Sequence, residues 1–121
     1  MTIAYRYQDL ICWQLANELE QLVFEVTATG PASKDFKFRD QIRDSSSSST
    51  RNMAEGGFLT IARGSLVETH NSAGAGLEKR YFSAADTERM QRLALHSSKA
   101  TTRLIKYLDS LPRGRRRGWA K

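Results

Sequence analysis

The chain has 121 residues, a length typical of one domain with a modest hydrophobic core of its own. Hydrophobic residues make up 40% and charged residues 26%, which excludes an intrinsically disordered chain and places the protein among globular ones. The formal net charge is +6, and no apolar run approaches the roughly 20 residues that a membrane-spanning helix needs.

The positive charge is concentrated at the C-terminus. Residues 113–121 contain no acidic side chain and five basic ones, namely Arg113, Arg115, Arg116, Arg117 and Lys121. Residues 1–112 contain 14 basic and 13 acidic side chains and are therefore nearly neutral. A short basic segment can bind phosphates without sequence specificity, and it can equally be a solvated chain end. We predict a folded domain over residues 1–112 and a disordered basic tail over residues 113–121.

The cellular setting follows from the cysteine content and the first residues. Cys12 is the single cysteine, so the chain cannot form an internal disulfide. The N-terminal sequence MTIAYRYQDL has no apolar segment after a basic start, and we expect no signal peptide. These observations predict a protein of the reducing cytoplasm without a membrane anchor.

The first predicted helix covers residues 8–29. Its apolar side chains recur at steps of three and four residues, at Leu15, Leu19, Leu22, Val23 and Val26. The Gly-Pro pair at residues 30–31 then ends the helix.

The second predicted helix begins near Ser33 or Lys34 and raises a question, because it contains the run SSSSSTRNMAEGG at residues 45–57. Five serines in a row are common in flexible linkers, yet Phe38, Ile42 and Met53 keep a helical spacing on both sides of the run. We interpret residues 45–51 as helical, with serine hydroxyls bonded to the carbonyl four residues earlier. Because serine buries little apolar area, we expect this segment to be the least stably packed part of the fold.

Two further helices follow. Residues 58–80 form the third, in which Gly64 predicts the close approach of another backbone, and Gly74 and Gly76 weaken the C-terminal end. Ser83 and Asp86 predict the start of the fourth helix through a capping interaction, and Pro112 ends it. No segment alternates apolar and polar residues as a strand does, so the sequence predicts an all-α, antiparallel four-helix bundle.

The sequence lacks the residue patterns of an active site. Its two histidines, His70 and His96, and its one cysteine are too few and too widely spaced for a zinc site, and no phosphate-binding loop is present. We therefore expect no enzymatic activity, no metal and no cofactor. Trp13, with Tyr5 and Tyr7, could stack on nucleic-acid bases, but packing at the end of a bundle or against another subunit is the favoured interpretation.

Asn52 and Glu55 are three residues apart and can share one helical face, with Met53 on the core side. Polar groups near a bundle interior need partners, which Arg63, Ser65 or the turn backbone could supply. We interpret both residues as structural.

Four ordered motifs resemble those of one protein family. Residues 9–16, DLICWQLA, resemble its opening DLxVWQxA, and residues 40–43, DQIR, resemble the start of its second helix. Residues 52–56, NMAEG, resemble its central NIAEG, and residues 61–68, IARGSLVE, resemble its third-helix motif IAxGSLxE. From about Tyr7 to Leu111 the chain is thus similar to the bacterial four-helix-bundle proteins also called ribosomal-RNA intervening-sequence proteins. The motif positions, which we take as structural, are Trp13, Asn52, Glu55, Gly56, Gly64, Ser65 and Glu68.

The resemblance implies an up-down-up-down bundle that assembles into a homo-oligomeric ring, with a pentamer favoured. It also implies a likeness in shape to accessory proteins of diversity-generating retroelements, which bind nucleic acid and reverse transcriptase. No catalytic residue is implied. We accordingly expect a non-enzymatic oligomeric scaffold or adaptor, and as the alternative an RNA- or DNA-binding protein that uses its basic tail.

The chain departs from the family pattern in two places. The family usually has AAVSIPA where residues 45–51 read SSSSSTR, so hydroxyls replace apolar groups and Thr50 replaces a proline. The family also has about ten more residues between its Glu-Gly and Phe-Leu, a length of roughly 15 Å on a helix. Here Gly57 alone separates Gly56 from Phe58, so either the third helix is shorter or a connecting segment is missing.

Overall fold

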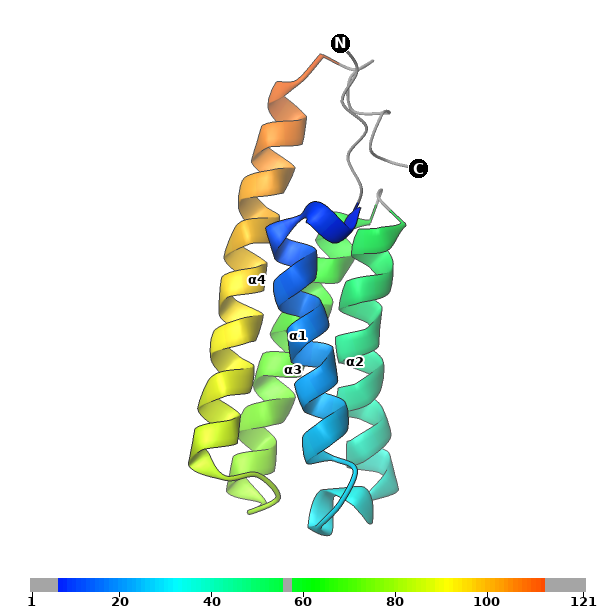
Figure 1. The fold of residues 1–121 in the computed structure, drawn as a ribbon, viewed down its shortest axis with the longest axis vertical. Coiled ribbons are helices and arrows are strands. Elements are labelled where there is room, and N and C mark those ends of the chain that lie inside the picture. Colours follow the sequence, from blue (N-terminus) through cyan, green and yellow to red (C-terminus); the bar gives the residue numbers. More distant parts are fainter. Residues whose placement is uncertain (1–6, 56–57, 113–121) are drawn as a thin grey trace.

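The computed structural model describes residues 7–55 and 58–112. Within these ranges the chain forms helices and no strand, which confirms the predicted all-α class (Figure 1). The α-helices are α1 (Ile11–Val26), α2 (Phe36–Ala54), α3 (Leu59–Glu78) and α4 (Ala84–Ser110). Two short 3₁₀-helices, η1 (Tyr7–Asp9) and η2 (Pro31–Ser33), precede α1 and α2. The predicted basic tail, residues 113–121, lies outside the described residues.

Each long helix packs against two others. Helix α1 contacts α2 and α4, and α3 also contacts α2 and α4, so the four helices surround one core. Figure 1 shows the α1–α2 and α3–α4 connections at its lower end, while the end of α2 and the start of α3 lie at the upper end. The last turns of α4 extend beyond the start of α1 at that upper end (Figure 1). None of the described helices is long and apolar enough to cross a membrane.

The apolar part of the core follows the stripes that the sequence predicts. The largest fully buried apolar side chains come from all four helices, namely Leu19, Val23, Ile42, Met53, Leu66 and Met90. Removing a side chain of this size from water contributes roughly 1.5–3 kcal/mol, so these few residues account for much of the packing energy.

Local signals set where the helices begin. Ser83 Oγ accepts a hydrogen bond from the backbone N–H of Asp86 at 3.0 Å, which confirms the predicted cap of α4. Helix α2 begins at Phe36 rather than at Ser33 or Lys34, because Asp35 accepts the Phe38 N–H at 3.2 Å and caps the helix there. Side-chain oxygens at these positions satisfy backbone donors that have no partner inside the helix.

The glycines of α3 have different roles from those predicted. A Cβ atom at Gly64 would meet nothing within 4 Å, so the predicted close approach of another backbone there is wrong. The close approach occurs at Gly76, where a Cβ atom would overlap the ring of Phe82 and lie 3.0 Å from Phe38 Cζ. Helix α3 is continuous to Glu78, and Gly76 lets these two aromatic rings pack directly against its backbone.

Candidate functional site

The serine run occupies the middle of α2 and faces the bundle. Ser45, Ser46, Ser49 and Thr50 are buried, as is Met53 one turn later. The prediction that residues 45–51 are helical is confirmed, although buried hydroxyls replace the apolar side chains expected on such a face. The local stability of this segment stays a prediction.

Two serines of the run, Ser45 and Ser48, join α2 to α3. The hydroxyls of Ser45 and Thr69 lie 2.8 Å apart in a buried hydrogen bond. About one helical turn further along, Ser65 Oγ donates to Ser48 Oγ at 2.9 Å. Asn52 Nδ2 donates to the same Ser48 hydroxyl at 3.0 Å and to the Ser48 carbonyl at 2.8 Å. A chain of hydrogen bonds therefore runs from Asn52 through Ser48 to Ser65.

On its other side, the serine run joins α2 to α1 through one carboxylate. Ser47 Oγ donates to Glu20 Oε2 at 2.6 Å, and Thr50 Oγ1 donates to Glu20 Oε1 at 2.9 Å. Both carboxylate oxygens of Glu20 thus accept a hydroxyl from α2. Hydrogen bonds to an ionised group are stronger than those between neutral groups, so this pair holds the two helices in register.

Two hydroxyls of the run form hydrogen bonds only within α2. Ser46 Oγ donates to the Arg43 carbonyl at 3.0 Å, and Ser49 Oγ donates to the Ser46 carbonyl at 2.7 Å. The expected bond back to the helix is present, but it reaches the carbonyl three residues earlier instead of four. These bonds satisfy fully buried hydroxyls without a partner on a neighbouring helix.

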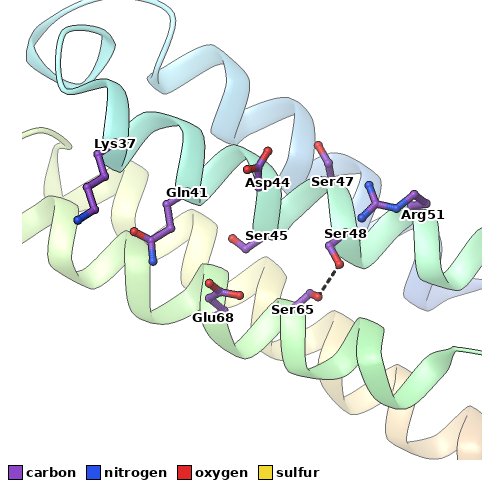
Figure 2. Close-up of a pocket in the computed structure, with 9 residues that line it drawn as sticks. All are labelled: Lys37, Gln41, Asp44, Ser45, Ser47, Ser48, Arg51, Ser65 and Glu68. Carbon is purple, nitrogen blue, oxygen red and sulfur yellow. Dashed lines mark hydrogen bonds between the residues drawn. The ribbon is translucent and has the colours of Figure 1, made fainter.

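An open polar groove of about 720 Å³ lies between α2 and α3 beside these hydrogen bonds (Figure 2). The side chains of both helices line it, namely Lys37, Gln41, Asp44, Ser45, Ser47, Ser48, Arg51, Ser65 and Glu68. Figure 2 shows Glu68 and Ser65 on α3 facing the serines of α2 across the groove. Lys37 and Arg51 balance Asp44 and Glu68 in charge, so the groove has hydrogen-bonding groups but no net charge.

The structure brings part of the predicted motif set to this groove. Ser65 and Glu68 line it, and Asn52 reaches it through Ser48. Gly64 is exposed beside Ser65, and Glu55 is exposed at the C-terminal cap of α2. Gly56 lies outside the described residues, as do the five predicted nucleic-acid-binding residues Arg113, Arg115, Arg116, Arg117 and Lys121.

The partners expected for Asn52 and Glu55 are only partly found. Asn52 meets Ser65 indirectly, through the Ser48 hydroxyl. Arg63 does not bond to Asn52, because its Nη1 donates to Thr102 Oγ1 on α4 at 3.1 Å. That bond turns Arg63 toward α4 and away from the α2–α3 groove, so the expected role for Arg63 is corrected.

Trp13 lies apart from the groove, at the start of α1. It is half-buried, and its ring packs edge-on against Tyr7 with centroids 5.3 Å apart and planes at 73°. Edge-to-face geometry is a favourable arrangement for aromatic pairs. This contact supports the packing interpretation, while the third aromatic residue of the predicted group, Tyr5, lies outside the described residues.

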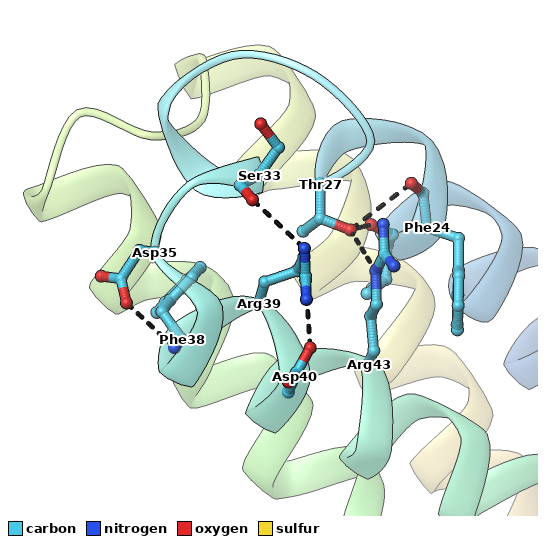
Figure 3. A network of polar contacts seen from close by, with 9 residues as sticks. Phe24, Thr27, Ser33, Asp35, Phe38, Arg39, Asp40 and Arg43 are labelled. Carbon is cyan, nitrogen blue, oxygen red and sulfur yellow. Dashed lines mark hydrogen bonds and ion pairs between the residues drawn. The ribbon is translucent and has the colours of Figure 1, made fainter.

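A second polar network covers the connection between α1 and α2 (Figure 3). Arg43 Nε donates to Thr27 Oγ1 at 2.8 Å, and the Thr27 hydroxyl donates to the Val23 carbonyl at 2.7 Å near the end of α1. Arg39 donates to the Ser33 carbonyl at 3.2 Å and pairs with the neighbouring Asp40. These contacts fix the turn between the helices. The side chains involved are engaged in the turn and do not form a candidate active site.

The carboxyl of Asp35 connects this turn to the one between α3 and α4. Tyr81 donates its hydroxyl to Asp35 Oδ2 at 2.7 Å. That hydrogen bond lowers the pKa of Asp35 and raises the pKa of Tyr81. Burial raises the pKa of the Cys12 thiol in the core. All three groups lie outside the α2–α3 groove.

The described residues do not assemble a metal site, since no three His, Cys, Asp or Glu side chains among them lie close enough to hold an ion. The groove can accept and donate hydrogen bonds, but its hydroxyls are largely engaged within the protein. The sequence did not predict two partners of the serine run, Glu20 on α1 and Thr69 on α3. Their signal was the serine run itself, because buried hydroxyls on one helix need acceptors on the helices beside it.

A family model described as 23S rRNA-intervening sequence protein matches residues 8–103, a range that takes in α1, α2, α3 and most of α4. No curated protein matches the chain.

Proposed function

Because the chain belongs to the 23S rRNA-intervening sequence protein family, we propose that it is a non-enzymatic bundle that self-associates and serves as a scaffold or adaptor. The observation that carries this proposal is an exposed apolar groove between α3 and α4. A groove of about 180 Å³ lies there, lined by Leu66, Val67, His70, Ala94, Leu95 and Ser98. Val67 is 51% exposed and Leu95 is 47% exposed, so both present apolar surface to solvent.

Hydrogen bonds between the same two helices bound this α3–α4 groove. Gln91 Nε2 donates to the His70 carbonyl at 3.3 Å on one side, and Arg63 donates to Thr102 on the other. The apolar centre thus has a polar contact on each of two sides, and apolar surface beside polar groups is typical of protein interfaces. We propose that a second copy of the chain covers Val67 and Leu95.

We further propose that the bundle has up-down-up-down topology and assembles into a homo-oligomeric ring in the cytoplasm, with five copies favoured. The α1–α2 and α3–α4 connections lie at one end of the molecule, and the end of α2 and the start of α3 lie at the other, which supports the topology (Figure 1). The resemblance of the four sequence motifs supports the ring. A head-to-tail interface that closes after a fixed rotation produces such a ring.

Native mass spectrometry and sedimentation velocity at micromolar concentration test this proposal. We expect the wild-type chain to form one discrete oligomer and the double variant Val67→Glu, Leu95→Glu to dissociate. The matched control places the same two charges elsewhere, at Ile11 and Phe36, which are 66% and 64% exposed. A wild-type chain that stays monomeric, or a control that dissociates equally, would overturn the proposed interface.

A second candidate function is nucleic-acid binding through the C-terminal tail. The tail has five basic side chains and no acidic one, and five copies on a ring would bring about 25 positive charges together. The multivalent assembly would bind phosphates far more strongly than a single tail does. Affinity for RNA and DNA should therefore fall when residues 113–121 are deleted, and an unchanged affinity would rule out the tail mechanism.

A further inference from the structure

The exposed side of α4 carries a line of basic residues. Arg92, His96, Lys99, Arg103 and Lys106 are all exposed and are spaced along the helix at steps of four and three residues. We call these five residues the basic face. It could not be recognised from the net charge of residues 1–112, because acidic residues elsewhere cancel it.

The basic face lies directly opposite the buried side of the helix. At about 100° per residue, its members point within about 40° of one direction, roughly 160–240° away from the buried Met90. Met90, Ala94, Ser97 and Thr101 form the opposite, buried side. With a rise of about 1.5 Å per residue, Arg92 and Lys106 are about 21 Å apart along the helix axis. The face is therefore a nearly straight row of basic groups along the exposed side of the helix.

Few acidic groups neutralise this row. Between Arg92 and Leu108 the chain has four Arg and Lys residues and no Asp or Glu. Glu88 contacts Arg92 at 3.7 Å at one end. Asp109 lies beyond the other end, pointing roughly 100° away from the centre of the face. Among the described residues, no carboxylate forms an ion pair with Lys99 or Arg103.

We propose that the basic face of α4 binds the sugar–phosphate backbone of nucleic acid without sequence specificity. Cations in a row with few neighbouring acids attract a polyanion, and binding is strengthened by the release of counterions from the phosphates. All five members of the face are polar, so their contacts are with phosphates, which carry no sequence information. The exposed Leu95 and Tyr107 lie beside the face. This inference rests on the nucleic-acid candidate function, to which it adds a folded surface.

An acidic helix from a second copy of the chain matches the basic face less well than nucleic acid does. Helix α1 contains three acidic residues and no basic one. Glu18 pairs with Arg89 at 3.5 Å, and both oxygens of Glu20 accept hydroxyls from α2. Only Glu25 of α1 then has no such contact, and one carboxylate does not complement four cations.

The chain continues from the basic face directly into the basic tail. Residues 92–121 contain nine Arg and Lys residues and one acidic residue, whereas residues 1–91 contain ten basic and twelve acidic ones. The positive charge of the protein therefore belongs to α4 and to the residues after it. A nucleic-acid strand attracted by the tail meets a second set of cations on the same helix.

The test measures the affinity of full-length protein for a labelled single-stranded RNA of about 30 nucleotides by fluorescence anisotropy over a range of salt concentrations. One variant replaces the basic face (Arg92→Gln, Lys99→Gln, Arg103→Gln, Lys106→Gln). The matched control removes four exposed charges from other surfaces (Lys34→Gln, Lys37→Gln, Arg51→Gln, Lys79→Gln), so both variants have the same net charge. A third variant replaces the five basic residues of the tail with glutamine. Circular dichroism checks that each variant keeps its helical content.

We expect the basic-face variant to lose about tenfold or more in affinity, and its plot of log affinity against log salt to become shallower by about 3. The control should bind within about twofold of the wild type. The tail variant should weaken binding yet keep a dependence on the basic face when the two sets of substitutions are combined. If the basic-face variant lost helical content, two double variants would replace it. One carries Arg92→Gln and Lys99→Gln, and the other carries Arg103→Gln and Lys106→Gln. Each should change the slope by about half as much as the full variant.

Three results would overturn the proposal. Wild-type affinity in the basic-face variant would show that the surface makes no contact, and equal losses in the basic-face and control variants would show an effect of net charge. Binding of the face to phosphatidylserine vesicles but not to RNA would assign it to a lipid surface. The oligomeric state is measured on the same samples, so a failure of the self-association proposal is detected independently.

Discussion

At the scale of single residues, the hydrogen bond between Tyr81 and Asp35 joins the two connections at one end of the bundle at 2.7 Å. Asp35 also caps α2, and Tyr81 packs edge-on against Phe38 with centroids 5.2 Å apart. Two loops that are distant in sequence are therefore held together by one carboxylate. The stabilisation that the Tyr81–Asp35 hydrogen bond provides must depend on pH, because the bond changes the pKa of both partners.

We predict that Tyr81→Phe unfolds at a lower temperature than the wild type near neutral pH. Because the pKa of Asp35 is lowered, the bond stabilises the fold at pH values above the unfolded-state pKa of about 3.9. That stabilisation is lost as the pH falls through the folded-state pKa of Asp35. The raised pKa of Tyr81 means that the stabilisation is also lost as pH rises through that pKa. The melting-temperature difference, measured by circular dichroism, should vanish at both extremes. Tyr107→Phe, at a 52% exposed tyrosine, is the control and should show no such profile.

Glycine substitutions in α3 should have opposite effects at two positions. Gly64→Ala should stabilise the protein by up to about 1 kcal/mol, because alanine favours the helix and nothing lies within 4 Å of the new Cβ atom. Gly76→Ala should destabilise it by about 1–3 kcal/mol, because the Cβ atom would overlap the buried Phe82 ring. Urea unfolding measures the change in the free energy of unfolding for both variants. Equal effects at the two positions would contradict the packing seen at Gly76.

At the scale of the helix, the serine run of α2 has two kinds of hydroxyl. Ser46 and Ser49 bond only to carbonyls of their own helix. Ser47 bonds to Glu20 on α1, and Thr50 bonds to both Glu20 and the Ser47 carbonyl. A hydroxyl of the run therefore bonds within its own helix or to a neighbouring helix, according to the direction in which the side chain points. A helical period of 3.6 residues distributes the run between the α1 side, the core and the α3 side.

The double variant Ser46→Ala, Ser49→Ala should leave stability unchanged or raise it by about 0.5–1 kcal/mol, because alanine is the better helix former and no partner on another helix loses a bond. Ser47→Ala with Thr50→Val should lower stability by about 1 kcal/mol, because the half-buried Glu20 carboxylate loses both hydroxyl donors. Chemical denaturation compares the two variants, which each remove two hydroxyls. A larger loss in the first variant would contradict the assigned bonding.

At the scale of the whole molecule, packing is uneven along the helices. Residues of α2 in the serine run are largely buried, whereas α4 has no fully buried residue after Thr101. The last turns of α4 also extend beyond the start of α1 (Figure 1). Backbone hydrogen bonds with few buried neighbours open at low free-energy cost.

Hydrogen exchange followed by mass spectrometry can therefore compare two expectations for local stability. Burial predicts that amides at residues 106–110 exchange faster than those at residues 90–101 and 45–51. The serine composition predicts instead that residues 45–51 exchange fastest, because they bury little apolar area. Fast exchange at 45–51 with slow exchange at 106–110 would show that composition outweighs the observed hydrogen bonds.

The sequence by itself determined the helices and the core. Steps of three and four residues at positions such as Leu19, Ile42 and Met90 identify the buried stripes, since this period is a local property of the chain. The capping pair Ser83 and Asp86 fixed the start of α4 for the same reason. The motifs of residues 9–16 and 52–68 were sufficient to indicate the family.

Only the tertiary structure decided which hydroxyls and charges meet. Glu20 and Ser47 are 27 residues apart, and Asp35 and Tyr81 are 46 apart, so their bonds depend on how the helices are placed against each other. The roles of Gly64 and Gly76 were assigned the wrong way round from sequence, because the close neighbours of Gly76 are rings from α2 and the α3–α4 turn. The basic face likewise emerged once the buried side of α4 was known, because exposure depends on how the whole helix packs.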